Sequence, residues 1–168
     1  SSPSRGLGDV YKRQLQHRGQ EGCGIVTFDG KKYYSEKRFG LVGDNFNKEE
    51  ILSKLKGNYA IGHNRYSTTG DNILRNLQPF FADTNAGGIG VAHNGNLTNS
   101  ISIRNKLVKD GAIFYTTSDT ETIVKLIAKS KRPNTIDKIV EAIFQIQGGY
   151  ALVTVSYTHL TLPTTYHV

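Results

Sequence analysis

The sequence contains a single cysteine among its 168 residues, so no disulfide can form within the chain. Disulfides are typical of oxidising compartments, and one cysteine therefore favours a reducing, cytoplasmic location. Long hydrophobic runs are missing as well, since the longest covers only residues 150–155. A membrane-spanning helix needs about 20 apolar residues, so we expect no membrane partner. The polar, Ser/Gly-rich start does not have the pattern of a secretory signal.

Basic residues are in excess, but they are not clustered. The net charge is +7, yet basic residues occur singly or in pairs such as Lys31-Lys32 and Lys131-Arg132. Nucleic-acid binding usually needs a denser basic patch, so we expect no nucleic-acid partner. A mildly basic surface, or a face that meets an acidic partner, remains the simpler interpretation. The length and the 37% hydrophobic content fit one globular domain.

The two ends of the chain suggest a separate origin. Residues 9–14 and 155–160 can be encoded by DNA strings that are reverse complements of each other, and the pair resembles the end of a transposase adaptor. We therefore expect residues 1–14 and 155–168 to be foreign tails, which should be left out of fold reasoning. The native segment would then be residues 15–154.

Apolar patterns alternate with turn signals along this segment. They predict strands at residues 24–28, 31–37, 59–63, 88–93 and 150–153. They predict helices at residues 48–56, between Asn99 and Gly111, after Ser118, and at residues 135–147. Residues 67–87 lack a clear pattern and are predicted to form a binding loop. This order of elements favours a layered α+β fold.

Five short segments place polar residues beside glycine or at the ends of predicted elements. They are His-Arg-Gly-Gln-Glu-Gly at 17–22, Gly-His-Asn-Arg-Tyr-Ser-Thr-Thr-Gly at 62–70, Asn-Leu-Gln-Pro-Phe at 76–80, His-Asn-Gly-Asn-Leu-Thr-Asn at 93–99 and Thr-Ser-Asp-Thr-Glu at 117–121. In this order the set resembles the glutamine amidotransferase domain of the N-terminal-nucleophile hydrolases, and most closely that of amidophosphoribosyltransferases. Sugar-aminating relatives usually carry Tyr-Arg-Gly-Tyr-Asp in place of the His-Arg-Gly-Gln-Glu stretch. The resemblance implies an incomplete four-layer αββα sandwich.

The resemblance also implies roles around a bound glutamine. Arg65 would hold the α-carboxylate with its planar guanidinium, and Asp119 would accept the α-ammonium. The Asn94 side chain and the Gly95 N–H would stabilise the oxyanion that forms when the amide is attacked. Each residue taken alone has a plainer interpretation: a surface ion pair for Arg65, a helix-start residue for Asp119, and a simple turn for Asn94-Gly95.

Three further residues take roles from the same resemblance. Arg18 would lie beside the nucleophile, with structural anchoring as the alternative. Tyr66 and Thr68 would line the glutamine pocket, the former partly through packing. The family's nucleophile is a cysteine at the start of the mature chain, and this sequence has no such residue. Cys23 follows a glycine at a predicted strand start and is interpreted as a small buried hydrophobe, so we expect the chain to be inactive.

Finally, the resemblance implies partners outside this segment. Glutamine would be hydrolysed to glutamate and ammonia, and the ammonia would reach phosphoribosyl pyrophosphate in a phosphoribosyltransferase domain that binds magnesium. We expect no metal or cofactor in the present segment and a homo-oligomer for the full-length enzyme. Two alternatives stay open: another glutamine amidotransferase, such as a sugar-aminating one, or a glutamine-binding module without catalysis.

Overall fold

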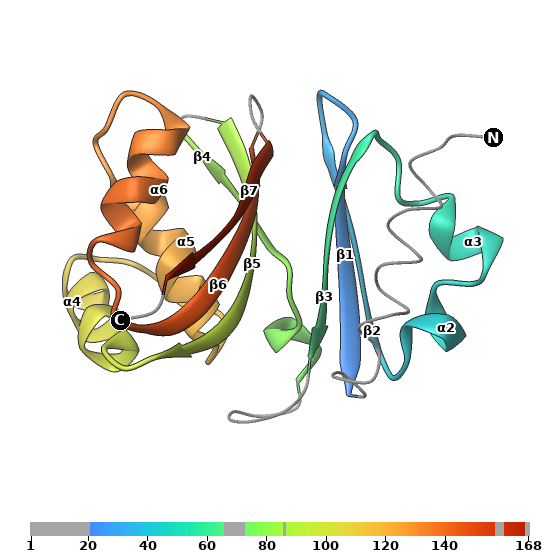
Figure 1. The fold of residues 1–168 in the computed structure, drawn as a ribbon, viewed down its shortest axis with the longest axis horizontal. Coiled ribbons are helices and arrows are strands. Elements are labelled where there is room, and N and C mark those ends of the chain that lie inside the picture. The colour runs from blue at the N-terminus through green and yellow to red at the C-terminus, as the bar shows by residue number, and fades with distance from the viewer. Residues whose placement is uncertain (1–20, 66–72, 86, 157–159, 167–168) are drawn as a thin grey trace.

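The computed structural model describes residues 21–65, 73–85, 87–156 and the backbone of 160–166. Two antiparallel sheets and two groups of helices form this part of the chain (Figure 1). The α+β class predicted from the sequence is therefore confirmed.

The smaller sheet has three strands in the order β2-β1-β3. They are β1 (Gly22–Phe28), β2 (Tyr33–Phe39) and β3 (Tyr59–Arg65). The central strand β1 is buried along its whole length, as expected for an apolar run paired on both sides. The predicted hairpin is present: Asp29 Oδ1 accepts the backbone N–H groups of Lys31 and Lys32 at 2.8 and 2.7 Å.

Two short helices cover the outer face of this sheet (Figure 1). They are α2 (Val42–Asn45) and α3 (Glu49–Leu52). Their buried side chains, Val42 and Ile51, pack in one cluster with Ile25 of β1. This cluster anchors the helices, since neither is long enough to be stable alone.

The larger sheet has the order β4-β5-β6-β7. Its strands are β4 (Phe80–Thr84), β5 (Gly87–Leu97), β6 (Gly148–Ser156) and β7 (Leu160–Tyr166). The helices α4 (Ser100–Lys109), α5 (Asp119–Lys129) and α6 (Thr135–Ile143) lie on one of its faces (Figure 1). Buried side chains of these helices and of β5 and β6 form the largest hydrophobic cluster among the described residues.

The two sheets pack face to face through a third cluster. It joins Val26 and Ile61 of the smaller sheet to Ala92 and Val155 of the larger one. The hydroxyl of Tyr33 adds a polar link, because it donates to the carbonyl of Gly88 at 2.9 Å. This junction brings the ends of β3 and β5 to the same region of the molecule.

Several predicted boundaries were wrong. The predicted loop at residues 67–87 contains η2 (Leu74–Asn76), a single 3-10 turn, and the strand β4. Strand β5 does not end at residue 93 but continues to Leu97, because β6 pairs with it along the whole stretch. The predicted helix at 48–56 is helical only over Glu49–Leu52. Tertiary pairing and packing decide these limits, which local patterns do not contain.

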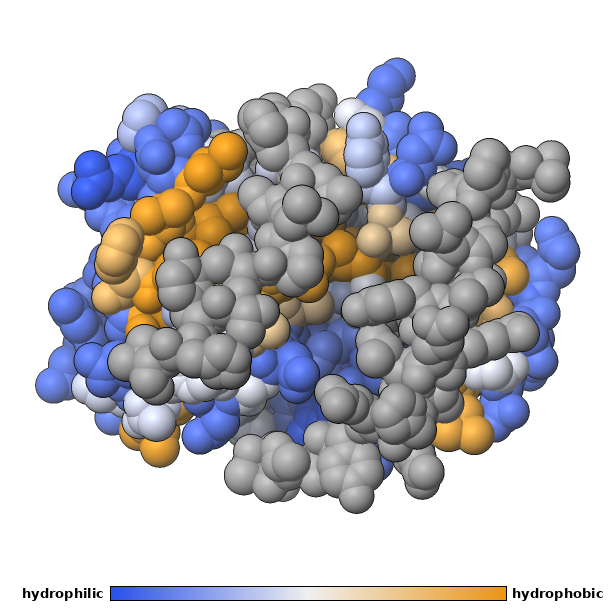
Figure 2. All heavy atoms as spheres, in the orientation of Figure 1, coloured by the Kyte–Doolittle hydropathy of each residue, from blue (hydrophilic) through white to orange (hydrophobic). Residues whose placement is uncertain are grey.

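Helix α6 presents part of its predicted apolar face to solvent. Ile139 is buried, whereas Ile136 and Val140 are each 42% exposed and Phe144, just after the helix, is 84% exposed. Figure 2 shows hydrophobic side chains gathered where α6 lies. The apolar periodicity therefore identified a helix, but only some of its apolar side chains reach the hydrophobic core.

No helix in the described parts of the chain is both long and apolar enough to cross a membrane. Part of the predicted C-terminal tail takes part in the larger sheet, since β6 ends at Ser156 and β7 pairs with it. The predicted N-terminal tail, residues 1–14, lies outside the described residues. The foreign origin of both tails stays a prediction, because strand pairing does not report on the source of a sequence.

Candidate functional site

The site is built around the start of helix α5. Ser118 is the N-cap, as predicted, and its hydroxyl accepts the backbone N–H of Thr120 at 3.3 Å. Glu121 does not close a capping box on Ser118. Its buried carboxylate reaches further back and accepts the N–H groups of Tyr115 and Thr116 at 3.0 and 2.7 Å, together with the Thr116 hydroxyl at 2.8 Å. The segment that leads into α5 is thereby fixed.

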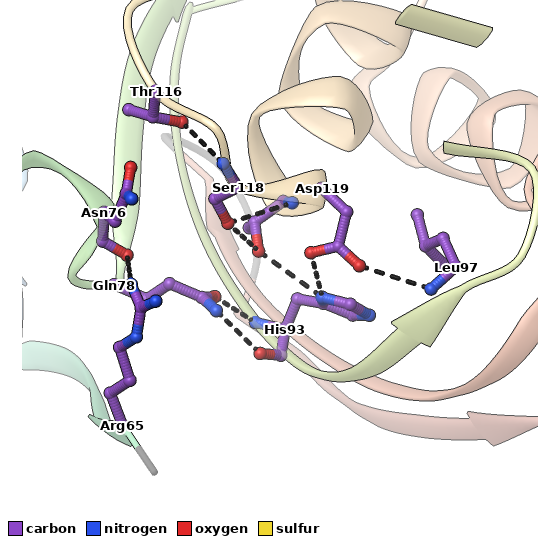
Figure 3. Close-up of polar contacts among 9 residues, drawn as sticks. Arg65, Asn76, Gln78, His93, Leu97, Thr116, Ser118 and Asp119 are labelled. Atoms are coloured by element: carbon purple, nitrogen blue, oxygen red, sulfur yellow. Dashed lines mark hydrogen bonds and ion pairs between the residues drawn. The ribbon is translucent and has the colours of Figure 1, made fainter. Parts of the chain in front are cut away.

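Asp119 is the first residue of α5 and is held against strand β5 (Figure 3). Its Oδ2 accepts the backbone N–H of Leu97 at 3.2 Å, and its Oδ1 lies 3.4 Å from Nδ1 of His93. Burial raises the pKa of Asp119. The contact with His93 and the backbone bond from Leu97 outweigh that effect, so the pKa lies below its ordinary value. Asp119 is therefore a carboxylate at neutral pH.

His93 is fixed in turn by Gln78 (Figure 3). The Gln78 side-chain Nε2 donates to the His93 carbonyl at 2.9 Å, and the His93 N–H donates to Gln78 Oε1 at 2.6 Å. Gln78 precedes β4 by two residues, so its amide continues the ladder that β4 forms with β5. The His93 ring also lies 3.4 Å from the Thr120 hydroxyl, which ties β5 to α5 a second time.

Arg65 reaches the same helix start from the other sheet. It is the last residue of β3, and its Nη1 donates to the backbone carbonyl of Asn76 at 3.2 Å. The buried Asn76 side chain then makes two bonds with Thr117: its Nδ2 donates to the Thr117 hydroxyl at 2.9 Å, and its Oδ1 accepts the Thr117 N–H at 3.2 Å. Arg65 is thus connected to the segment that carries Asp119.

Asn94 and Gly95 are exposed and lie in β5 directly after His93. They pair with Ala151 and Tyr150 of β6, so the simple-turn alternative is wrong. Gly95 has φ +141°, and a Cβ at this position would lie 2.3 Å from the Gly149 carbonyl oxygen. Only glycine fits this strand position without a backbone shift.

The predicted site residues therefore meet in part. Arg65 and Asp119 are both tied to the start of α5, and Asn94 and Gly95 follow the histidine that contacts Asp119. Their roles toward glutamine stay predictions. Three predicted residues, Arg18, Tyr66 and Thr68, lie outside the described residues.

A second histidine lies near this network. The ring nitrogen Nδ1 of His63 is buried, and within the described residues neither it nor Nε2 of His93 has a hydrogen-bond partner. Burial, with smaller effects of His93 and Arg65, lowers the pKa of His63 from 6.5 to about 4. His63 is therefore neutral at physiological pH.

Cys23 has the environment of a packing residue, as predicted. It is 2% exposed and belongs to the cluster between β1 and the short helices. Its Sγ lies 3.5 Å from the carbonyl oxygen of Gly40. A thiol in such surroundings is a poor nucleophile. Among the described residues, no group of three or more histidine, cysteine, aspartate or glutamate side chains could hold a metal ion.

Several residues of this network were not assigned roles from the sequence, among them Asn76, Gln78, Thr117 and Glu121. All four lie inside the motif segments at 76–80 and 117–121. The feature of the sequence that could have indicated these residues is a hydrogen-bonding side chain close to the start or end of a predicted helix or strand. Their partners could not be predicted, because Asn76 and Thr117 are 41 positions apart.

The class of this domain follows from its similarity to known proteins. A family model described as a glutamine amidotransferase domain matches residues 63–162, more than half of the chain, and the chain belongs to this family. Curated proteins that are similar to this chain include several amidophosphoribosyltransferases. The Rhizobium etli enzyme is 49% identical over 87% of this chain and 29% of its own length, and the chloroplastic enzyme of Vigna aconitifolia is 50% identical over 83% and 28%.

Solved structures that are similar to this chain include enzymes of the same kind. Glutamine phosphoribosylpyrophosphate amidotransferase from B. subtilis, complexed with ADP and GMP, matches with TM-score 0.78 and 40% identity over 90% of this chain and 32% of that chain. A structure described as the allosteric regulatory enzyme of purine biosynthesis matches with TM-score 0.81 and 41% identity over the same shares. The chain thus spans about a third of the length of the relatives it matches.

Proposed function

We propose that the chain is the glutamine-binding segment of an amidophosphoribosyltransferase. In the complete enzyme, glutamine is hydrolysed to glutamate and ammonia, and the ammonia is transferred to phosphoribosyl pyrophosphate to give phosphoribosylamine for purine synthesis. The similarity to enzymes of this name supports the proposal. The observation that carries it is the polar network that ties a cation, Arg65, and a carboxylate, Asp119, to one helix start.

The two charged groups match the two ends of an α-amino acid. Asp119 is ionised at neutral pH and accepts an α-ammonium, while the Arg65 guanidinium binds an α-carboxylate. The side chain of the bound amino acid then extends toward Asn94 and Gly95 at the exposed part of β5. The Asn94 amide and the Gly95 N–H are donors that suit an amide oxygen and the oxyanion formed from it.

Hydrolysis needs a nucleophile that the described residues do not provide. Cys23 is the only cysteine of the sequence, and it is buried away from Asn94 and Asp119 in the cluster with α2 and α3. We therefore propose that this chain recognises glutamine but does not hydrolyse it. We further propose that the fold is an incomplete αββα sandwich of the type found in N-terminal-nucleophile hydrolases.

Other parts of the proposal concern the complete enzyme. Phosphoribosyl pyrophosphate and magnesium belong to a phosphoribosyltransferase domain, not to this segment. The complete enzyme is a cytoplasmic homo-oligomer.

A ligand series tests the site. The chain is titrated by calorimetry with glutamine, with 4-carbamoylbutanoate, which lacks the α-ammonium, and with 4-aminobutanamide, which lacks the α-carboxylate. The same titrations follow for Asp119→Asn and for Asp137→Asn, an exposed first-turn aspartate of α6 that serves as the matched control. A hydrogen bond to a charged group contributes about 1.5–3 kcal/mol, so Asp119→Asn should weaken glutamine binding roughly 10- to 100-fold.

The substitution at Asp119 should affect only ligands that carry an α-ammonium. Asp119→Asn should leave the affinity for 4-carbamoylbutanoate nearly unchanged, and Asp137→Asn should change neither affinity. Equal affinities of the wild-type chain for all three ligands would contradict the assignment. Ammonia release from glutamine that is abolished by Cys23→Ser would contradict the proposed lack of hydrolysis.

A further inference from the structure

The two charged groups of the proposed glutamine site come from different sheets. Arg65 ends β3 in the smaller sheet, whereas Asp119 begins α5, which packs on the larger sheet. The binding of one small ligand by both groups requires a fixed distance between them. Packing between the sheets is apolar and lies at Val26 and Val155, so it does not itself orient the Arg65 side chain.

Asn76 is the residue that connects the two sides. Its backbone carbonyl accepts from Arg65 Nη1 at 3.2 Å, while its side chain exchanges two hydrogen bonds with Thr117 at 2.9 and 3.2 Å. Asn76 is only 2% exposed, so these bonds are shielded from water and a lost partner is costly. Figure 3 shows Asn76 between Arg65 and the segment that leads into α5.

The Thr117 side of this connection is rigid. The preceding residue, Thr116, is bonded through its N–H and its hydroxyl to the buried carboxylate of Glu121. The Thr116 carbonyl also accepts from Nη2 of Arg104 at 2.8 Å. A displacement of Asn76 relative to Thr117 is therefore not absorbed by movement of the Thr117 segment.

We propose that Asn76 and Thr117 form a clasp that sets the spacing between Arg65 and Asp119. Both are positioning residues, and neither needs to touch the ligand. The clasp selects ligands that carry an α-carboxylate and an α-ammonium on one carbon over ligands that carry only one of these groups. This last statement rests on the proposed function, whereas the positioning of Arg65 does not.

Two substitutions at Thr117 isolate the clasp. Thr117 is exposed, so its replacement should not disturb the core. Thr117→Val has the same shape but removes the oxygen that accepts from Asn76 Nδ2, and Thr117→Ser keeps that oxygen. A cooperative thermal unfolding transition verifies that each variant folds. Thr117→Val should unfold at a lower temperature than wild type, because the buried Asn76 Nδ2 loses a hydrogen-bond partner, and Thr117→Ser should unfold close to the wild-type temperature.

The first measurement needs no ligand. Nitrogen-15 relaxation of the Arg65 side-chain Nε–H reports how firmly the guanidinium is held. The order parameter should fall in Thr117→Val and return to the wild-type value in Thr117→Ser. The same order parameter in all three proteins would overturn the clasp, whether or not glutamine binds.

The second measurement is glutamine affinity. One neutral hydrogen bond contributes about 1 kcal/mol, so Thr117→Val should weaken glutamine binding roughly five-fold, with Thr117→Ser close to wild type. Binding of 4-carbamoylbutanoate or 4-aminobutanamide should change less than glutamine binding does. In an Arg65→Ala background, Thr117→Val should have no further effect on glutamine, because it acts through Arg65.

The two measurements separate the two ideas. A wild-type chain that binds no glutamine overturns the proposed function, while the relaxation data still decide whether the clasp holds Arg65. Glutamine binding that is weakened equally by Thr117→Val and Thr117→Ser overturns the clasp and leaves the proposed function standing.

Discussion

At the scale of single residues, Gly95 shows how a strand can continue through a backbone conformation that requires glycine. Its φ of +141° is a conformation that other residues rarely adopt, and the Gly149 carbonyl occupies the place of a Cβ. The strand nevertheless keeps its pairing with β6 at this point. The absence of a side chain is what allows β5 to continue past Asn94 to Leu97, whose backbone N–H donates to Asp119.

Gly95→Ala should therefore destabilise the chain. The new Cβ meets backbone atoms that cannot rotate away, and residues in such strained conformations cost of order 1–3 kcal/mol. Urea unfolding measures the change. Gly43→Ala is the control, because Gly43 lies in α2 with open space around it, and alanine there should be neutral or slightly stabilising. Equal unfolding free energies for Gly95→Ala and wild type would contradict the close approach.

His63 gives the chain a pH-dependent stability. Its pKa is about 4 in the folded chain and near 6.5 in the unfolded one, so between these pH values the unfolded chain binds a proton that the folded chain does not. The stability is fully present above pH 6.5 and is lost as the pH falls to 4, by up to roughly 3 kcal/mol.

A His63→Gln variant tests this dependence. The unfolding free energies of variant and wild type are compared at several values between pH 7 and pH 4. The wild-type value should fall more steeply across the interval, since the variant has no imidazole at this position. Parallel curves for the two proteins would show that His63 is not kept neutral by burial.

At the scale of elements, the start of α5 is organised by interactions that run against the usual capping pattern. The Glu121 carboxylate bonds to Tyr115 and Thr116, before the helix, and does not cap the backbone N–H of Ser118. The helix thus fixes the segment before it as well as its own first turn. Asp119 and Thr117 obtain their positions from this arrangement.

Glu121→Gln should loosen that segment. A carboxamide keeps one acceptor oxygen but turns the other into a donor that faces a backbone N–H, which leaves buried groups unpaired at a cost of about 1–3 kcal/mol. Chemical denaturation measures the loss, and Glu49→Gln provides the control, because Glu49 is an exposed glutamate at the start of α3. Wild-type stability in Glu121→Gln would contradict the role of the carboxylate.

Another element-level feature is the close contact between β1 and the segment before β4. A Cβ on Gly24 would lie 2.1 Å from the Gln78 carbonyl oxygen. Glycine in β1 therefore lets Gln78 approach the sheet, from where its amide holds both backbone groups of His93.

At the scale of the whole molecule, the described parts of the two sheets are joined by a small apolar cluster and by a polar link through Tyr33. The link is the Tyr33 hydroxyl, which donates to the Gly88 carbonyl and also lies 3.3 Å from the carbonyl of Val155. The Tyr33 ring stacks on Phe28 and contacts Phe81 in a tilted arrangement, with centroid separations of 4.5 Å to each. Burial raises the pKa of Tyr33 to about 12, so the hydroxyl stays a donor.

Tyr33→Phe removes this link while keeping the ring. The carbonyls of the larger sheet then lose a partly buried donor, and the chain should lose about 1 kcal/mol of unfolding free energy. Tyr34→Phe is the matched control, because the Tyr34 hydroxyl bonds only to the exposed Asp29 among the contacts described. A larger loss for Tyr34→Phe than for Tyr33→Phe, measured in urea, would contradict the importance of the link.

The sequence determined most elements and the identity of the charged site residues. Alternation and turn signals located β1, β2 and β3, and Ser118 was found as the N-cap of α5. These features depend on neighbours in the chain, so local patterns contain them. The resemblance of the motif segments to glutamine amidotransferases, and not residue type alone, led to the prediction of a carboxylate-binding arginine and an ammonium-binding aspartate.

The tertiary structure alone decided how these parts meet. Nothing local indicates that Asn76 bonds to Thr117, that the Gln78 amide completes the ladder to His93, or that β6 carries β5 through Asn94-Gly95. Each is a contact between residues far apart in sequence, and its energy exists only once the sheets and α5 have packed. The distance between Arg65 and Asp119 is for the same reason a property of the folded chain and not of the motifs.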